Sequence, residues 1–405
     1  MKGVFVLGTA VYECAGRVYF GDMCYAETIR HCEPQLSEVC VVARCRSVKT
    51  VGANWPSFLD VGADLILKLP DFGQGRVRRW IRLLRCIGLQ DRLRQIMEAS
   101  DFVYVENACV ESFLGARAAA RAGRMVMLEM RSEGGMAQGY MRARFGLFGR
   151  PYSWIFRRLF AYVLKNSDSG LYLNEATMRQ FPVRGAHMAA ISDVRIPDEL
   201  RRAPQDLGEP ATKYLFVGHL EKAKKVDLIL SALADARSNL PVNWLLTVAG
   251  DGPERTALEH LATRLGIRGR VHFLGNIPWG ENLFRLYRQS HLLLITSLVE
   301  TGPRVLLEGM AAGLAVLSTP VGLARELLGP PMLVNSWDVS VWSGALTMCV
   351  NEPSTWRAAA AQSYRQLEQF DWTSLSCRRR RFYQEAIQRG VVARRMLVKN
   401  ATGVV

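Results

Sequence analysis

From Lys213 onward the chain repeats one pattern, in which a short apolar run is followed by a stretch with helical spacing. The apolar runs read YLFVG, WLLTVAG, VHFLG, HLLLITS, AVLST and MLVN. Short buried strands that alternate with helices form a parallel sheet with helices on both faces. This half of the chain is therefore predicted to be a Rossmann-like α/β domain.

The first half contains a second series of apolar runs. They read KGVFVLG, VCVVAR, LILKLP, FVYVEN, MVMLEM and GLYLN. The first run also resembles a signal peptide, but it is short and passes into a Gly/Ala-containing turn, as a buried strand does. A chain of 405 residues exceeds the size at which one core keeps growing. The sequence therefore predicts two α/β domains.

The expected boundaries follow from changes in composition. The segment IPDELRRAPQDLGEPATK is polar, has three prolines and shows no sustained apolar period, as a linker does. Beyond about Ser354 the sequence is helical and basic, and it is predicted to pack back on the N-terminal domain. The expected division is an N-terminal domain over 1–197, a linker over 198–212, a C-terminal domain over 213–355 and a helical tail over 356–405.

Charge and cysteine content limit the possible partners. The formal net charge is +15, and three arginine-rich runs with interleaved aromatic residues lie at 76–95, 141–165 and 377–384. Such runs suit an anionic membrane, nucleic acid or an acidic acceptor, or else they are solvated helix faces. The nine cysteines lack metal-site spacing and indicate reduced thiols. The apolar stretches are shorter than the roughly 20 residues that cross a bilayer.

Ligands of open α/β sheets bind beyond the carboxyl ends of the strands. After the first strand of the C-terminal domain, Gly218 lets a ligand approach the backbone, and His219 and Lys224 precede a helix start, which predicts an anion site. A surface lysine cluster is the alternative. After the second strand comes the glycine turn at Gly250, and after the third, beyond Phe273, a Gly-Asn-Ile-Pro loop could bind a base through its backbone.

Two carboxylates follow the fourth strand in VETGPRVLLEGMAAG. Glu300 lies in the predicted loop and Glu308 on the predicted helix. Carboxylates on the ligand side of a helix start can accept hydrogen bonds from a vicinal diol, as on a sugar or a ribose. Alternatively, Glu308 pairs with Arg304 one turn back. The candidate donor contacts also include four residues between the carboxylates: Thr301, Gly302, Arg304 and Val305.

The motifs from Leu215 to Gly322, in the order given above, resemble those of the family 4 retaining glycosyltransferases. The resemblance implies the GT-B fold, in which two Rossmann-like domains face each other across a cleft. The resemblance implies that Glu300 holds donor-sugar hydroxyls, that Glu308 holds ribose hydroxyls, and that His219 and Lys224 neutralise the leaving diphosphate. An Asp-x-Asp motif is absent from the sequence, so we expect neither a metal nor a cofactor beyond the nucleotide-sugar donor.

The chain departs from the family pattern at several positions. His219 stands where the family most often has arginine, and Glu-Thr-Gly-Pro replaces Glu-Gly-Phe-Gly, which puts Pro303 near the expected phosphates. The family often has a histidine in its N-terminal domain that faces the donor sugar. Neither His31 nor His187 matches that position, for which the candidates are Arg131, Glu129 and Glu133.

The N-terminal half carries SGLYLNEATMRQFP, which resembles a segment of transferases of bacterial surface-polysaccharide pathways. The resemblance implies a retaining transferase that moves a sugar to a glycan or a polyprenyl-diphosphate-linked acceptor. It would act in the cytoplasm or on the inner face of the cell membrane, with no nucleic-acid partner. Two alternatives remain: a catalytically weakened nucleotide-binding scaffold, which the changes at His219 and Pro303 suggest, and a nucleotide-sugar epimerase of similar fold.

Overall fold

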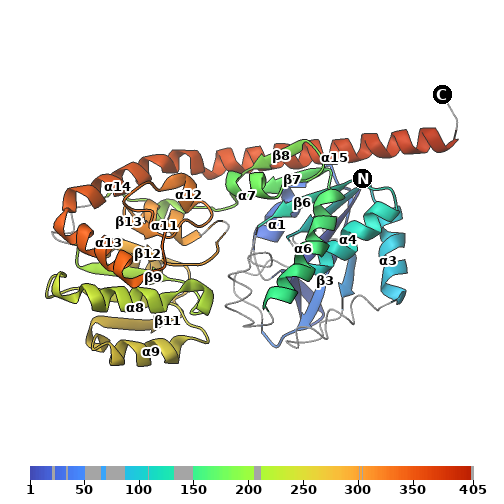
Figure 1. Cartoon of the computed structure of the whole chain (residues 1–405). Helices are drawn as coiled ribbons and strands as arrows, with labels where there is room; N and C mark the ends of the chain where they lie inside the picture. Colours follow the sequence, from blue (N-terminus) through green and yellow to red (C-terminus); the bar gives the residue numbers. More distant parts are fainter. Residues whose placement is uncertain are drawn as a thin grey trace. The chain divides into compact units, whose positions relative to one another are not determined.

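The computed structural model describes residues 1–20, 23–32, 35–50, 65–69, 87–107, 109–131, 149–204, 211–300, 302 and 304–402. The chain divides into two units. The first comprises Met1–Met136, Pro151–Asp193 and Thr373–Val405, and the second comprises Ala137–Arg150 and Val194–Trp372. Each unit contains its own largely parallel sheet flanked by helices (Figure 1). The predicted α/β class is confirmed for both halves.

The sheet of the first unit has the order β4-β3-β1-β5-β6-β7-β8, with β2 antiparallel to β1. The strands β5 and β6 are buried at every position, as expected for strands that helices cover on both faces. The six predicted runs all contain strands, whereas β2 and β8 were not predicted. The strands are β1 Lys2–Cys14, β2 Arg17–Phe20, β3 Glu38–Ser47, β4 Leu65–Leu69, β5 Phe102–Glu106, β6 Val126–Met130, β7 Ser169–Tyr172 and β8 His187–Ala190.

Helices complete the first unit, and the last of them comes from the C-terminus. The helices are α1 Met23–Cys32, α3 Ile87–Glu98, α4 Val110–Arg121, α6 Gly149–Lys165, α7 Glu175–Gln180 and α15 Trp372–Thr402. In α15, Leu375, Arg379 and Tyr383 are buried at intervals of four residues, so one face of the helix packs on the first unit. Arg379 belongs to the third arginine-rich run, and its three neighbouring arginines are exposed.

The sheet of the second unit has the order β11-β10-β9-β12-β13 and is parallel throughout. Its strands are β9 Lys213–Val217, β10 Leu245–Ala249, β11 Val271–Gly275, β12 Leu292–Ile295 and β13 Ala315–Ser318. The chain runs outward from β9 to β11 and then returns to β12 on the other side of β9. The sixth predicted strand, MLVN, forms only an isolated bridge between Leu333 and Ser318.

The second unit contains the helices α8 Val226–Asp235, α9 Arg255–Arg264, α10 Glu281–Arg288, α11 Arg304–Ala311, α12 Ala324–Leu327, α13 Val339–Asn351 and α14 Pro353–Arg365. Short 3-10 turns include Asp198–Leu200, Lys222–Lys224 and Gln366–Phe370. In α14, Trp356 and Ala360 join the core of this unit. The change between units at Thr373 therefore lies later than the expected tail start at residue 356, and the change at Val194 lies earlier than the expected linker.

The described residues add two observations. The seven cysteines whose side chains the structure describes are free thiols. Among the described helices, none is long and apolar enough to cross a membrane.

Candidate functional site

The loop after β9 lies against the carboxyl end of β12, where the strand order reverses. The Leu298 N–H donates to the Ala223 carbonyl at 2.8 Å. The buried Thr296 hydroxyl donates to the carbonyls of Lys224 at 2.7 Å and Lys225 at 3.0 Å. These contacts hold Lys224 at the switch point of the sheet, the position at which such folds bind ligands.

Lys224 and Glu300 form an ion pair at this switch point. The Lys224 ammonium contacts Glu300 Oε1, and the Ser297 hydroxyl donates to the same oxygen at 3.0 Å. The two charged side chains are 22% and 19% exposed, so both groups remain accessible to a ligand. The sequence predicted a cation and a carboxylate at this edge, and the structure brings them into direct contact.

Glu308 is a buried carboxylate on α11. Tyr287 on α10 donates its hydroxyl to Glu308 Oε2 at 2.8 Å, and the Trp279 indole N–H donates to Oε1 at 3.1 Å. Burial raises the pKa of Glu308, although these two donors and the nearby Arg304 charge lower it. The charge is thus satisfied by hydrogen bonds across the unit. Arg304, proposed above as the partner, acts on Glu308 through its charge.

A pocket of about 300 Å³ opens beside these groups at the carboxyl ends of β9, β10 and β11. Gly250 has φ +155°, and a Cβ there would lie 1.8 Å from the Gly218 carbonyl oxygen. Only glycine allows this close approach of the two loops. The pocket residues are Val217, Gly218, His219, Ala249, Gly250, Asp251, Gly252, Asn276, Ile277 and Leu283.

The predicted site residues divide into three groups. Gly218, His219 and Gly250 line the pocket. Lys224 and Glu300 pair with each other at the carboxyl edge of the same sheet. Phe273 lies within β11 and packs against the hydrophobic core, and Asn276 and Ile277 beyond it line the pocket. Gly302, Arg304 and Val305 lie at the start of α11 or just before it, and Thr301 and Pro303 lie outside the described residues.

In the first unit, Glu129 lies in a buried network of charged and hydroxyl groups. It is fully buried and accepts hydrogen bonds from Tyr104 at 2.9 Å, Tyr383 at 2.5 Å, Arg379 at 2.5 Å and Arg131 at 2.9 Å. Burial would raise the pKa of Glu129, but the two guanidinium groups and the Tyr383 hydroxyl hold it below its usual range.

The other candidates for the position facing the donor sugar are also engaged with the protein. Arg131 pairs with Glu129 and with Asp193, 3.4 Å away, and its side chain is 10% exposed. His31 lies 3.0 Å from Ser376 and His187 3.2 Å from Glu385, so both histidines pack against α15. Glu133 lies outside the described residues. Both histidines are therefore in contact with the C-terminal helix of the same unit.

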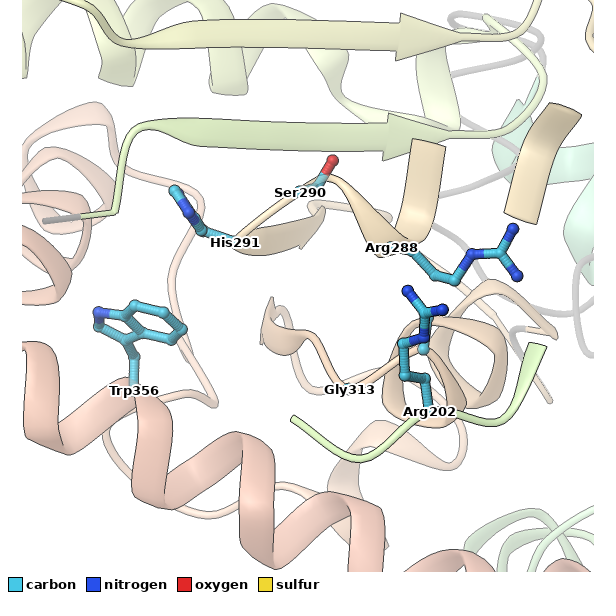
Figure 2. A pocket seen from close by; sticks show the side chains of 7 residues that line it. Arg202, Arg288, Ser290, His291, Gly313 and Trp356 are labelled. Atoms are coloured by element: carbon cyan, nitrogen blue, oxygen red, sulfur yellow. The ribbon is translucent and has the colours of Figure 1, made fainter. Parts of the chain in front are cut away.

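A small cavity lies at the opposite edge of the second sheet (Figure 2). His291, directly before β12, and Trp356 line one side, and Arg202 and Arg288 lie on the other side. The volume is about 10 Å³, which holds one water molecule and no sugar. His291 Nδ1 accepts the Thr212 N–H at 2.9 Å, so this is a packing cavity of the second unit.

Comparison with known proteins identifies the segment that carries the site. The profile of the family "Glycosyl transferases group 1" matches residues 198–331. This segment belongs to the group 1 glycosyl transferases. The segment contains β9 to β13, the Lys224–Glu300 pair and Glu308. The predicted family is therefore confirmed where the predicted motifs lie.

Curated relatives of the group 1 segment include two bacterial enzymes. The D-inositol 3-phosphate glycosyltransferase of Rhodococcus opacus is 32% identical over 181 residues, which cover 42% of this chain and 40% of the relative. A Campylobacter jejuni N-acetyl-D-galactosaminyltransferase, named for a diNAcBac-PP-undecaprenol-linked substrate, is 38% identical over 96 residues, 24% of this chain and 25% of the relative. The match to the first of these spans about two fifths of the relative's length.

Solved structures extend the likeness to both units. The Anabaena HepE protein, determined in complex with UDP, superposes with a TM-score of 0.65 at 16% identity over 93% of this chain and 98% of that chain. WaaG, a glycosyltransferase involved in lipopolysaccharide biosynthesis, gives a TM-score of 0.60 at 18% identity, with 93% and 98% covered. The group 1 segment is thus the second half of a GT-B fold, as predicted.

Sequence reasoning missed the partners of the carboxylates in the group 1 segment. Tyr287, Trp279 and Ser297 hold Glu308 and Glu300, and none was predicted. One signal was present, because α10 buries Leu283, Phe284 and Tyr287 on its apolar face. A buried tyrosine hydroxyl needs a hydrogen-bond acceptor. Glu308, a carboxylate among apolar residues, needed a hydrogen-bond donor.

Proposed function

We propose that this protein is a retaining glycosyltransferase that takes a sugar from a nucleotide-sugar donor without a metal ion or other cofactor. The observation that carries the proposal is the pair of carboxylates, Glu300 and Glu308, next to a cation and a glycine-lined pocket at one sheet edge. A nucleotide sugar has a diphosphate for Lys224 and His219, a ribose diol for Glu308 and sugar hydroxyls for Glu300.

The electrostatics of the edge suit departure of a nucleoside diphosphate. Negative charge develops on the leaving phosphates, and preorganised cations stabilise that charge as the bond to the sugar breaks. Lys224 supplies a fixed positive charge there, and this supports transfer without a metal. Retention of configuration follows from the family resemblance. The anomeric coupling constant of the product, measured by NMR, tests it, and a product of inverted configuration would refute it.

Titration of the protein with UDP, GDP and dTDP tests the proposed donor site. The nucleotide that binds most tightly is then titrated into the Glu308→Gln variant. We expect one nucleotide to bind, and the variant to bind it about tenfold to a hundredfold more weakly, because a charge-assisted hydrogen bond is worth about 1.5–3 kcal/mol. Glu326→Gln, a carboxylate on α12, is the matched control. Equal affinity of Glu308→Gln and parent would show that Glu308 is only a satisfied core charge.

The alternatives predicted from the sequence make different claims. A weakened scaffold would bind the nucleotide and release no sugar from any donor, and an epimerase would convert a nucleotide sugar without an acceptor. The relatives of the group 1 segment are named as transferases, which favours transfer. The acceptor we propose is a glycan or a polyprenyl-diphosphate-linked sugar, as in the name of the Campylobacter jejuni relative.

Such an acceptor would place the enzyme at an anionic membrane surface, and α6 is suited to it. Its 17 residues include no acid. Trp154 is 60% and Ile155 45% exposed, Arg157 and Arg158 are also exposed, and the Arg158 guanidinium lies 5.0 Å from the centre of the Trp154 ring. Exposed tryptophan and arginine together favour the lipid interface.

The membrane proposal predicts that Arg157→Gln/Arg158→Gln weakens binding to mixed phosphatidylglycerol and phosphatidylcholine vesicles by about thirtyfold, since each of the two basic residues contributes about 1 kcal/mol near an anionic surface. Co-sedimentation measures the bound fraction. The control is Arg92→Gln/Arg121→Gln, which removes two exposed arginines from α3 and α4. If both pairs lowered binding equally, net charge alone would explain it; unchanged binding would remove α6 from the surface.

A further inference from the structure

Trp279 has an unusual position for a largely exposed tryptophan. It lies in the turn between β11 and α10, and it is 54% exposed. Its indole nevertheless donates a hydrogen bond to the buried Glu308 at 3.1 Å. Its ring meets Phe284 edge-on with centroids 5.3 Å apart. An exposed side chain thus covers a buried carboxylate.

The two hydrogen-bond donors to Glu308 differ in how easily they can leave. Tyr287 is 0% exposed within the core, and its hydroxyl lies 2.8 Å from Oε2. Trp279 holds Oε1 from the solvent side. Glu308 itself is only 3% exposed, so a ribose hydroxyl needs space at the carboxylate. Of these two donors, the indole is the one that can make that space without opening the core.

The surroundings of Trp279 connect it to the pocket. Asn276 and Ile277 before it and Leu283 after it line the pocket of about 300 Å³. Glu308 is not among the lining residues, which agrees with its cover by the indole. Trp279, which covers Glu308, therefore lies in the same turn as two of the residues that line the pocket.

We propose that Trp279 is a gate on the ribose site: its indole N–H occupies the place of a ribose hydroxyl on Glu308 and leaves when a nucleoside binds. The inference rests on the proposed function, because it assigns the same carboxylate to the ribose. The gate satisfies the buried charge in the empty protein, where an unpaired carboxylate would be costly. It also makes each binding event break one protein hydrogen bond.

The gate predicts an unusual direction of change. Trp279→Phe keeps an aromatic ring against Phe284 but removes the N–H. The variant destabilises the empty state and leaves the bound state unaffected, so the ligand binds more tightly. We expect the dissociation constant for UDP, measured by calorimetry, to fall about threefold to tenfold, with GDP as the probe if UDP does not bind.

A matched control separates this effect from the loss of any indole N–H. Trp337 is 39% exposed, lies in the same unit and donates to the Thr296 carbonyl at 3.2 Å. Trp337→Phe should leave the affinity for UDP within about twofold of the parent. A second readout is tryptophan fluorescence. Its intensity should change when UDP binds the parent, and most of this change should be absent when UDP binds Trp279→Phe.

The outcomes distinguish the gate from the proposed function. If Glu308→Gln weakens UDP binding and Trp279→Phe strengthens it, both stand. If Glu308→Gln weakens it but Trp279→Phe binds UDP equally well or more weakly, the gate is wrong and the ribose site remains; weaker binding would make the indole a wall of the site. If the parent binds none of UDP, GDP and dTDP, the proposed function and the gate fall together.

Discussion

Replacement of Arg379 by methionine is expected to lower the free energy of unfolding by about 3–5 kcal/mol, the cost of leaving a buried charge without its partner. Arg379 donates to Glu129 Oε1 at 2.5 Å and to the Ile191 carbonyl at 3.0 Å, and its side chain is 2% exposed. Methionine fills similar volume, so the loss reports the charge and hydrogen bonds more than a cavity.

The reason for so large an effect is the location of the network. Glu129 lies at the end of β6 and Arg379 on α15, 250 residues later. Arg131 and Tyr383 share the same carboxylate. When Arg379 is absent, one cation and two tyrosine hydroxyls must balance a charge that water cannot reach. The C-terminal helix also loses a buried ion pair with the sheet.

The control for this prediction is Arg381→Met, two residues along the same helix. Arg381 is 83% exposed and pairs with Glu385 one turn away at 2.9 Å. An exposed pair of this kind is worth less than about 1 kcal/mol. Urea denaturation followed by circular dichroism compares the two variants. Equal midpoints for both would mean that the buried pair contributes no more than a surface pair.

A second comparison tests whether the buried charge causes the loss. Glu129→Gln combined with Arg379→Met removes both charges while keeping similar shapes. The double variant should recover part of the stability that Arg379→Met loses, because the carboxylate that has lost one of its two cations is no longer present. A double variant that is less stable than the parent by the sum of the two single losses would contradict this explanation.

The two sheets could be predicted from sequence because strands covered on both faces are continuous apolar runs. MLVN has the same composition, but it follows β13 and pairs only through Leu333. Composition does not say whether a neighbouring strand is within reach. The boundary at Thr373 was missed for a related reason, since the apolar face of α14 shows that it packs on a core but does not show which core.

The carboxylates could be predicted, but their partners could not. Glu308 was conspicuous as a charge among apolar neighbours. Trp279 and Tyr287 lie 29 and 21 residues before it, and only the tertiary packing brings these side chains together. The arginine run at 377–384 is similar, because four adjacent arginines look equivalent until the helix phase set by Leu375 and Tyr383 selects Arg379.

The largest effect on activity is expected at Lys224. Lys224→Met should lower the rate of sugar transfer by about a hundredfold to a thousandfold, as removal of one preorganised group that stabilises transition-state charge does elsewhere. Thr296 holds the Lys224 carbonyl and Leu298 holds the adjacent Ala223 carbonyl. The backbone that carries the ammonium is therefore fixed before the donor arrives. Release of the nucleoside diphosphate from the donor, with and without acceptor, measures the rate.

The neighbouring Lys222 is the matched control. It lies in the same 3-10 turn and is exposed, so Lys222→Met removes the same charge from nearly the same place. Its rate should stay within about threefold of the parent, because long-range charge acts weakly through water at physiological salt. Equal losses in the two variants would show that the positive surface as a whole matters and that Lys224 has no special role.

Because Lys224 pairs with Glu300, a lower rate of Lys224→Met can be interpreted only if Glu300 is changed as well. Without Lys224, the Glu300 carboxylate keeps only the Ser297 hydroxyl among the partners described above, and its charge would repel the diphosphate. Lys224→Met/Glu300→Gln removes this repulsion. If the double variant regained most of the rate, the lysine would serve only to neutralise Glu300. We expect instead that the double variant is at least as slow as Lys224→Met, because the lysine acts on the phosphates and the carboxylate on the sugar.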